Sequence, residues 1–140
     1  MKKTFLLCAA LFIIAGRMLV ACSDKPADAL TGDWRLVSYG SPSNPTSAAP
    51  GVETSLTFGK DGSIRGSVGC NTFGGDYKID GDNIIFGMLA STEMACEEPL
   101  MQQERAVFNA FTNSTTFKIE GSLLTITSSD GANAVVLARR

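Results

Sequence analysis

The sequence predicts an α+β fold, a single small domain made of one antiparallel sheet of about eight strands and one helix near residues 99–113. Two patterns support this prediction: short segments of alternating apolar and polar residues flank glycine-containing turns, and one segment repeats its apolar residues at helical spacing. The length of 140 residues suits one compact domain. A multidomain enzyme is therefore excluded.

The predicted strands are mostly paired around short turns. The first, residues 34–39, precedes residues 40–51, which hold three prolines and no bulky apolar residue and are expected to form a long exposed loop. Turns such as Lys60-Asp61-Gly62 favour hairpins. The remaining strands are expected at residues 55–58, 63–68, 76–79, 83–86, 116–120, 123–127 and 134–138.

The helix is predicted from its N-terminal residues and from its apolar face. Pro99 suits a first helical turn, and Glu97 and Glu98 suit the positive end of the helix dipole. One side of the helix carries Leu100, Val107, Phe108 and Phe111. We expect this helix to plug or flank the sheet.

Glu104 is an acid within the apolar face of that helix, between the directions of Val107 and Phe108. A buried carboxylate needs hydrogen-bond partners, and Asn71 and Thr92 are the candidates for a structural polar network. The alternative is a catalytic general acid. No second carboxylate is positioned by the sequence to complete an acid–base pair, so the structural role is favoured.

The first 21 residues have the organisation of an export signal. Met1-Lys2-Lys3 is positively charged, and residues 4–16 form an apolar run that is short for a membrane span. The following Leu19-Val20-Ala21-Cys22 resembles the lipobox of bacterial lipoproteins, in which cleavage leaves an acylated cysteine as the new N-terminus. Cys22 is therefore the predicted lipidation site, carrying palmitate-type acyl chains that together hold a protein durably. An ordinary secretory signal, or a membrane helix continuing to Ala21, is the alternative.

Removal of the signal makes the protein acidic. Nine basic and 14 acidic residues remain, a formal net charge of −5, after the loss of Lys2, Lys3 and Arg17. Membrane contact is then expected through the acyl chains on Cys22 alone. Residues 22–31 are predicted to be a lipidated polar tether and residues 32–140 the domain. Ser23 resembles the sorting signal of outer-membrane lipoproteins, so we expect anchoring in the outer membrane, on its periplasmic side.

Composition excludes several kinds of function. The full chain has a net charge of −2, which gives no basic field for nucleic acid. It has no histidine, which excludes Ser-His-Asp and Cys-His catalysis and most catalytic zinc sites. We therefore expect no enzyme activity, no metal and no cofactor.

The cysteines indicate one disulfide. Cys8 leaves with the signal and Cys22 is acylated, so Cys70 and Cys96 remain as the two thiols of an exported domain. A reactive or metal-binding pair, with Met94 as a soft ligand, is the alternative. Two thiols without histidine or a CxxC spacing make a poor metal site, which favours the disulfide.

Two motifs resemble those of the META domain family, also called HslJ-like: Ser67–Tyr77 (SVGCNTFGGDY) and Leu89–Cys96 (LASTEMAC). The similarity includes Gln103-Glu104 on the predicted helix. It extends from Gly32-Asp33-Trp34-Arg35-Leu36 to Leu124-Thr125-Ile126 and so covers nearly all of residues 32–138. It implies a sheet curled around one helix into a barrel-like shape, with cysteines at the positions of Cys70 and Cys96. Members are associated with heat shock and with tolerance to antibiotics such as novobiocin, and no enzymatic activity is established for the family.

The function expected from this resemblance is that of a non-catalytic outer-membrane lipoprotein. It would support envelope stress or antibiotic tolerance by binding an envelope protein or a small apolar ligand. The alternative is a partner-specific escort or inhibitor, similar to secretin pilots or lysozyme inhibitors. A preformed apolar cavity would favour ligand binding, whereas a filled core with an exposed apolar patch would favour protein binding.

Overall fold

The structure is a computed structural model that describes residues 26–112 and 114–140. The predictions for the signal peptide and for Cys22 fall outside these residues. The chain forms α1 (Pro26–Leu30), β1 (Gly32–Ser41), β2 (Asn44–Ser47), β3 (Ser55–Phe58), β4 (Ser63–Ser67), β5 (Thr72–Asp80), β6 (Asn83–Phe86), β7 (Ala90–Ser91), α2 (Glu98–Ala110), β8 (Ser114–Glu120), β9 (Leu123–Thr127) and β10 (Ala134–Arg139).

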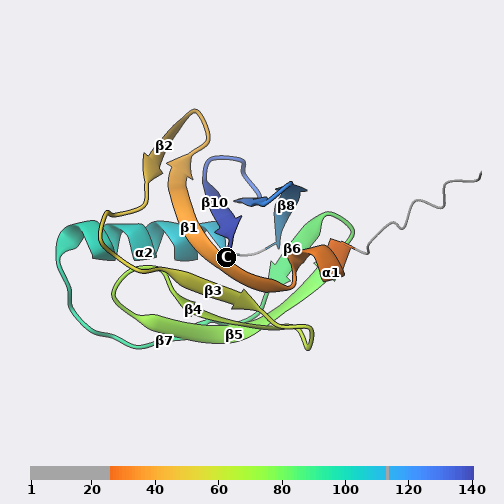
Figure 1. The fold of residues 1–140 in the computed structure, drawn as a ribbon, viewed down its shortest axis with the longest axis horizontal. Coiled ribbons are helices and arrows are strands. Elements are labelled where there is room, and N and C mark those ends of the chain that lie inside the picture. The colour runs from red at the N-terminus through yellow and green to blue at the C-terminus, as the bar shows by residue number, and fades with distance from the viewer. Residues whose placement is uncertain (1–25, 113) are drawn as a thin grey trace, which may run out of the picture.

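Eight of the strands form a closed antiparallel barrel in the order β1-β3-β4-β5-β6-β8-β9-β10 (Figure 1). The barrel closes because β1 pairs along its length with two partners, with Trp34 opposite Leu56 of β3 and Leu36 opposite Leu137 of β10. Two extra strands lie outside this ring, β2 on β1 and β7 on β5. The predicted α+β fold, with about eight strands in a curled sheet and one long helix, is confirmed.

Residues 40–51 differ from their prediction, because they contain a strand as well as a loop. β2 pairs with the end of β1, with Tyr39 opposite Thr46 and Gly40 opposite Pro45. All four β2 residues are exposed, as expected for this segment. An edge strand tolerates proline, and a segment exposed on both faces has no alternation of apolar residues by which to recognise it.

The predicted tether also differs, because its end belongs to the domain. Leu30 is completely buried in the core, and its carbonyl accepts a 2.9 Å hydrogen bond from the indole N–H of Trp34. The side chain of Arg139 donates to the carbonyls of Ala29 and Thr31 and lies 4.2 Å from the Trp34 ring. These contacts attach α1 to the first and last strands of the barrel, at the place where Trp34 is paired with Arg139, so the folded part begins before residue 32.

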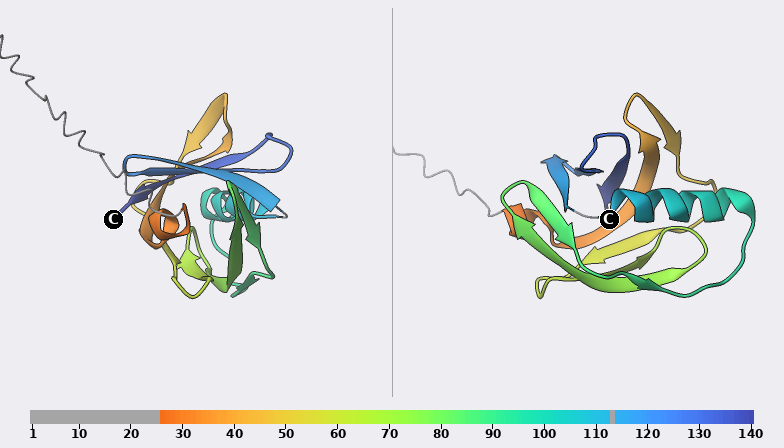
Figure 2. Two further views of the ribbon diagram at one scale, coloured as in Figure 1. Left: turned by 90° about the vertical axis from the view of Figure 1, so that its right-hand side faces the viewer. Right: turned by 180° about the vertical axis from the view of Figure 1, so that it is seen from behind.

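Side chains fill the interior of the barrel. Trp34 and Phe58 are completely buried there, and Phe58 meets Tyr77 edge to face at 5.2 Å. α2 lies in the mouth of the barrel, where Figure 2 shows it end-on between the strands. Val107 of this helix and Phe111, the residue that follows it, join the core. No helix in the described ranges is long and apolar enough to cross a membrane.

Candidate functional site

The two sequence motifs meet beside α2, where they line a surface hollow of about 350 Å³. α2 supplies one wall, and the segment that leads from β7 to α2 supplies the other. The lining residues are Asn71, Ser91, Thr92, Glu93, Met94, Ala95, Met101, Glu104 and Phe108. All three predicted network residues are among them, so this hollow is the candidate functional site.

Glu104 accepts three hydrogen bonds from the first motif. Its Oε2 accepts from the backbone N–H of Asn71 at 2.7 Å and from that of Cys70 at 3.1 Å. Its Oε1 accepts from Nδ2 of Asn71 at 2.7 Å. The side chain is only 5% exposed. The carboxylate therefore holds the start of β5 against the helix, and both of its oxygens are occupied.

Asn71 connects Glu104 to the second motif. Its Oδ1 accepts from the Thr92 hydroxyl at 2.8 Å and from the backbone N–H of Met94 at 2.7 Å, and Thr92 Oγ1 in turn accepts from the backbone N–H of Thr72. Asn71 is 2% exposed. The structure thus brings Asn71, Thr92 and Glu104 into one network that joins a strand, a loop and a helix.

Gln103 is a second buried polar residue of α2, to which the sequence reasoning gave no role. Its Nε2 donates to the carbonyl of Val68, and its Oε1 accepts from the backbone N–H of Ala49 at 2.7 Å. Gln103 is completely buried. Its position four residues before the buried Val107 places it on the same helical face, which is the signal that could have identified it.

Gly69 permits the close approach of α2 to the first motif. A Cβ atom at this position would lie 2.7 Å from the carbonyl oxygen of Leu100 and 3.2 Å from Cβ of Glu104. Both distances are shorter than ordinary contacts, so any larger residue would displace the helix. Glycine here sets the distance over which Glu104 reaches the backbone of Cys70 and Asn71.

Cys70 and Cys96 form a disulfide, as predicted, with their Cα atoms 6.1 Å apart. The bond closes a loop with a sequence separation of 26, which restricts the unfolded chain by about 3.5 kcal/mol on the loop-entropy estimate. It also fixes the segment of Thr92 and Met94 beside Asn71. Bridged sulfurs are not thiolate ligands, and the described residues contain no group of three or more His, Cys, Asp or Glu side chains suited to a metal ion.

A second hollow of about 270 Å³ adjoins the first, since both are lined by Ser91 and Phe108. Leu89 and Phe111 add apolar surface to it. Met94 at the first hollow is 55% exposed, and Met88, next to Leu89 in the chain, is 92% exposed. Large apolar side chains are thus presented to solvent around these hollows.

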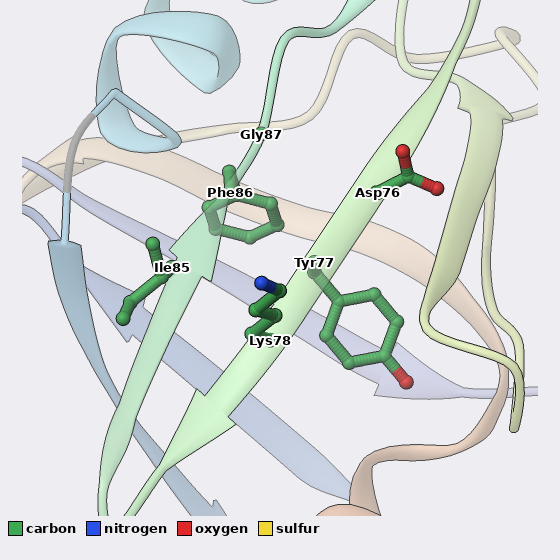
Figure 3. A pocket seen from close by; sticks show the side chains of 6 residues that line it. All are labelled: Asp76, Tyr77, Lys78, Ile85, Phe86 and Gly87. Carbon is green, nitrogen blue, oxygen red and sulfur yellow. The ribbon is translucent and has the colours of Figure 1, made fainter.

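A third hollow lies on β5 and β6, and its lining includes the charged residues Asp76 and Lys78 (Figure 3). It is lined by Asp76, Tyr77, Lys78, Ile85, Phe86 and Gly87, with Lys78 paired opposite Ile85. Burial raises the pKa of the Tyr77 phenol above its usual value, and the hydroxyl donates to the carbonyl of Gly59 at 2.8 Å. The phenol is therefore neutral and structural.

The META domain profile matches residues 28–140, which is most of the chain. The protein belongs to the META domain family. The match begins within α1, in agreement with the burial of Leu30 in this META domain. Among proteins with curated descriptions, none matches the chain.

Solved structures share the fold of this META domain at low sequence identity. A protein from Burkholderia xenovorans, solved by NMR, superposes with a TM-score of 0.67 at 23% identity, over 81% of this chain and 86% of that one. Another protein solved by NMR superposes with a TM-score of 0.64 at 17% identity, over 82% of this chain and 95% of that one. A DUF4847 family protein from Bacteroides vulgatus gives 0.58 at 14% identity, over 79% and 94%.

Proposed function

We propose that this META domain protein is a non-catalytic lipoprotein of the bacterial outer membrane that binds another envelope protein and so supports tolerance of envelope stress or antibiotics. One observation carries the choice of a protein partner over a small apolar ligand. Side chains fill the barrel interior, while large apolar side chains are exposed around the surface hollows.

A carrier of small apolar ligands needs an enclosed cavity in which most of the ligand surface is buried. In this barrel, Trp34, Phe58 and Ile126 occupy that space. An exposed apolar patch is instead the usual mark of a protein-binding surface. Met94, 55% exposed, provides apolar surface at the first hollow, and Met88, 92% exposed, is the chain neighbour of Leu89 at the second.

The chemistry of the candidate site supports a binding role without catalysis. Glu104 is occupied by three hydrogen-bond donors, and the chain has no histidine to serve as a base. The buried network holds the two motifs in place beneath the hollow. Its contribution is therefore the shape of a binding surface.

The anchor is proposed from the lipobox. Cys22→Ser should move the protein from the membrane fraction to the soluble fraction, and mass spectrometry of the wild-type N-terminal peptide should find acyl chains. Unchanged membrane fractionation together with an unmodified peptide mass would disprove the anchor.

The binding role is tested by affinity capture from envelope extracts with the soluble domain, residues 26–140. An excess of the untagged domain serves as the competitor. Protein partners should be captured and then displaced by the competitor, and a single dominant partner would favour the escort or inhibitor alternative. Recovery of lipids without any displaceable protein would contradict the proposal.

The stress role is tested in cells. A strain without the protein should be more sensitive to novobiocin and to envelope stress, and the wild-type gene should restore tolerance. The Cys22→Ser gene should restore it poorly, because the released protein is no longer held at the membrane. Equal tolerance of the deletion and parent strains would refute this part of the proposal.

A further inference from the structure

We infer that the two adjoining hollows beside α2 bind a cationic amphipathic segment of the partner protein. This inference rests on the proposed protein-binding function and specifies the chemistry of the partner. The apolar part of the site is Leu89, Met94, Met101 and Phe108, called here the methionine surface. Its acidic margin is Glu93, Glu97 and Glu98.

The methionine surface is suited to an apolar segment of variable shape. Met94 and Met101 line one hollow, Leu89 lines the other, and Phe108 lies in both. Methionine side chains are flexible and polarisable, which lets them adjust to different apolar partners. Met88, the neighbour of Leu89 in the chain, exposes 92% of its surface and extends the apolar character beyond the hollows.

The charge around this surface selects a cation. From Glu93 to Glu104 the sequence contains four carboxylates and no basic residue, and of the four only Glu104 is buried. Glu93 lines the first hollow, and Glu97 and Glu98 follow it at the N-terminal end of α2, all three exposed. Glu98 pairs with Arg105 at 2.8 Å, whereas no ion pair involves Glu93 or Glu97 within the described residues. Their charge is available to a partner with lysine or arginine beside its apolar face.

The same charge disfavours other occupants. A second copy would place its own acidic margin against this one, and an anionic lipid surface would be repelled. The position of the site also favours a partner in solution. The N-terminal end of α2 lies at the opposite end of the molecule from α1, which holds the first described residue, Pro26 (Figures 1 and 2).

The test uses the soluble domain, residues 26–140, and a fluorescein-labelled amphipathic peptide of leucine and lysine, about 18 residues or five helical turns long. Fluorescence anisotropy measures the dissociation constant. A leucine–glutamate peptide of the same pattern and a lysine–serine peptide are the controls for charge and for apolar surface. Anionic phospholipid vesicles and sedimentation equilibrium test the lipid and self-association alternatives.

We expect the leucine–lysine peptide to bind at least about tenfold more tightly than either control, a difference of about 1.4 kcal/mol. Met94→Gln with Met101→Gln should weaken its binding about tenfold, and Leu123→Gln, a matched change at an exposed leucine of β9, should not. Glu93→Lys with Glu97→Lys should weaken binding and reduce its dependence on salt, and Glu53→Lys should not.

Three results would overturn the inference. These are equal binding of the leucine–glutamate peptide, equal effects of the methionine variants and of Leu123→Gln, and binding of vesicles or of a second copy in place of the peptide. Capture of envelope proteins distinguishes failure of this inference from failure of the proposed function. If envelope proteins are captured equally well by the wild-type and methionine variants, protein binding stands and this surface is wrong; if none is captured, the proposed function itself fails.

Discussion

Replacement of Glu104 tests whether this carboxylate holds the two motifs and the helix together. Glu104→Leu removes the acceptor for the backbone N–H and the side-chain N–H₂ of Asn71, a residue that is 2% exposed. Each buried donor left without a partner costs about 1 to 3 kcal/mol. Burial of the leucine offsets roughly 2 kcal/mol of this. Two such donors, less the leucine term, lower the free energy of unfolding by about 2 kcal/mol in Glu104→Leu, with an upper bound of about 4 kcal/mol.

Glu104→Gln should cost less, about 1 kcal/mol, because it keeps the shape and one acceptor oxygen. The side-chain N–H₂ group of the new glutamine would face the N–H donors of Cys70 or Asn71. The Asn71 side chain cannot rotate to offer its oxygen to this N–H₂ group without losing the bonds that this oxygen accepts from Thr92 and Met94. The wild type should therefore be the most stable, Glu104→Gln less stable and Glu104→Leu the least stable.

The assay is equilibrium unfolding in denaturant of residues 26–140 with the disulfide intact. Gln102→Leu, an exposed position on the same helix, is the matched control and should change stability by no more than about 0.5 kcal/mol. Hydrogen exchange adds a local measurement, since the amide protons of Cys70 and Asn71 should lose protection in Glu104→Leu alone. A leucine variant as stable as the parent would refute the structural role of the network.

Three further predictions concern the surroundings of this network and the turns. Gly69→Ala should destabilise the domain by about 1 to 3 kcal/mol in the same unfolding assay. Gly74→Ala should be close to neutral, because a Cβ atom there would lie 3.7 Å from the carbonyl oxygen of Ile64; equal effects would contradict the close approach of α2 at Gly69. Cys70→Ser with Cys96→Ser should cost about 3.5 kcal/mol, and thiol labelling of the denatured, unreduced wild-type domain should find neither cysteine free. Hydrogen bonds from Ser63 lower the pKa of the exposed Asp61 below 3.8. The carboxylate therefore stabilises the fold above pH 3.8, and this contribution is lost as the pH falls through the lowered pKa. Asp61→Asn should reduce the fall in melting temperature at acid pH, and an unchanged fall would refute this.

Local patterns were sufficient to predict eight of the ten strands and the longer helix. Alternation around glycine turns placed strands such as 55–58, 83–86 and 123–127 at the bounds that the structure has. An apolar period of two residues marks a strand with one buried face, and a period of 3.6 residues marks a helix with one buried face. Elimination among four cysteines was enough to predict the pair Cys70–Cys96. The resemblance of the two motifs indicated the family before any fold was known.

Local patterns failed where a residue's role depends on a distant partner. β2 was missed because it is exposed on both faces, and its pairing with β1 is all that marks it as a strand. Leu30 was placed in the tether because one leucine in a polar segment gives no period, and the acceptor for the indole of Trp34 is identified only in three dimensions. Gln103 was part of the resemblance but received no role, because its partners, Val68 and Ala49, lie far away in the sequence.

The sequence was enough to predict most strands of this META domain, its longer helix, its disulfide and the acid on the buried face of that helix. Closure of the barrel by β1 and β10 and the filled interior were decided only by the tertiary structure, because both depend on contacts between residues about 100 positions apart. The same holds for the hollow that Met94 and Met101 both line. Periodicity says which face of an element is buried, whereas packing decides what that face meets and which apolar side chains remain exposed to solvent.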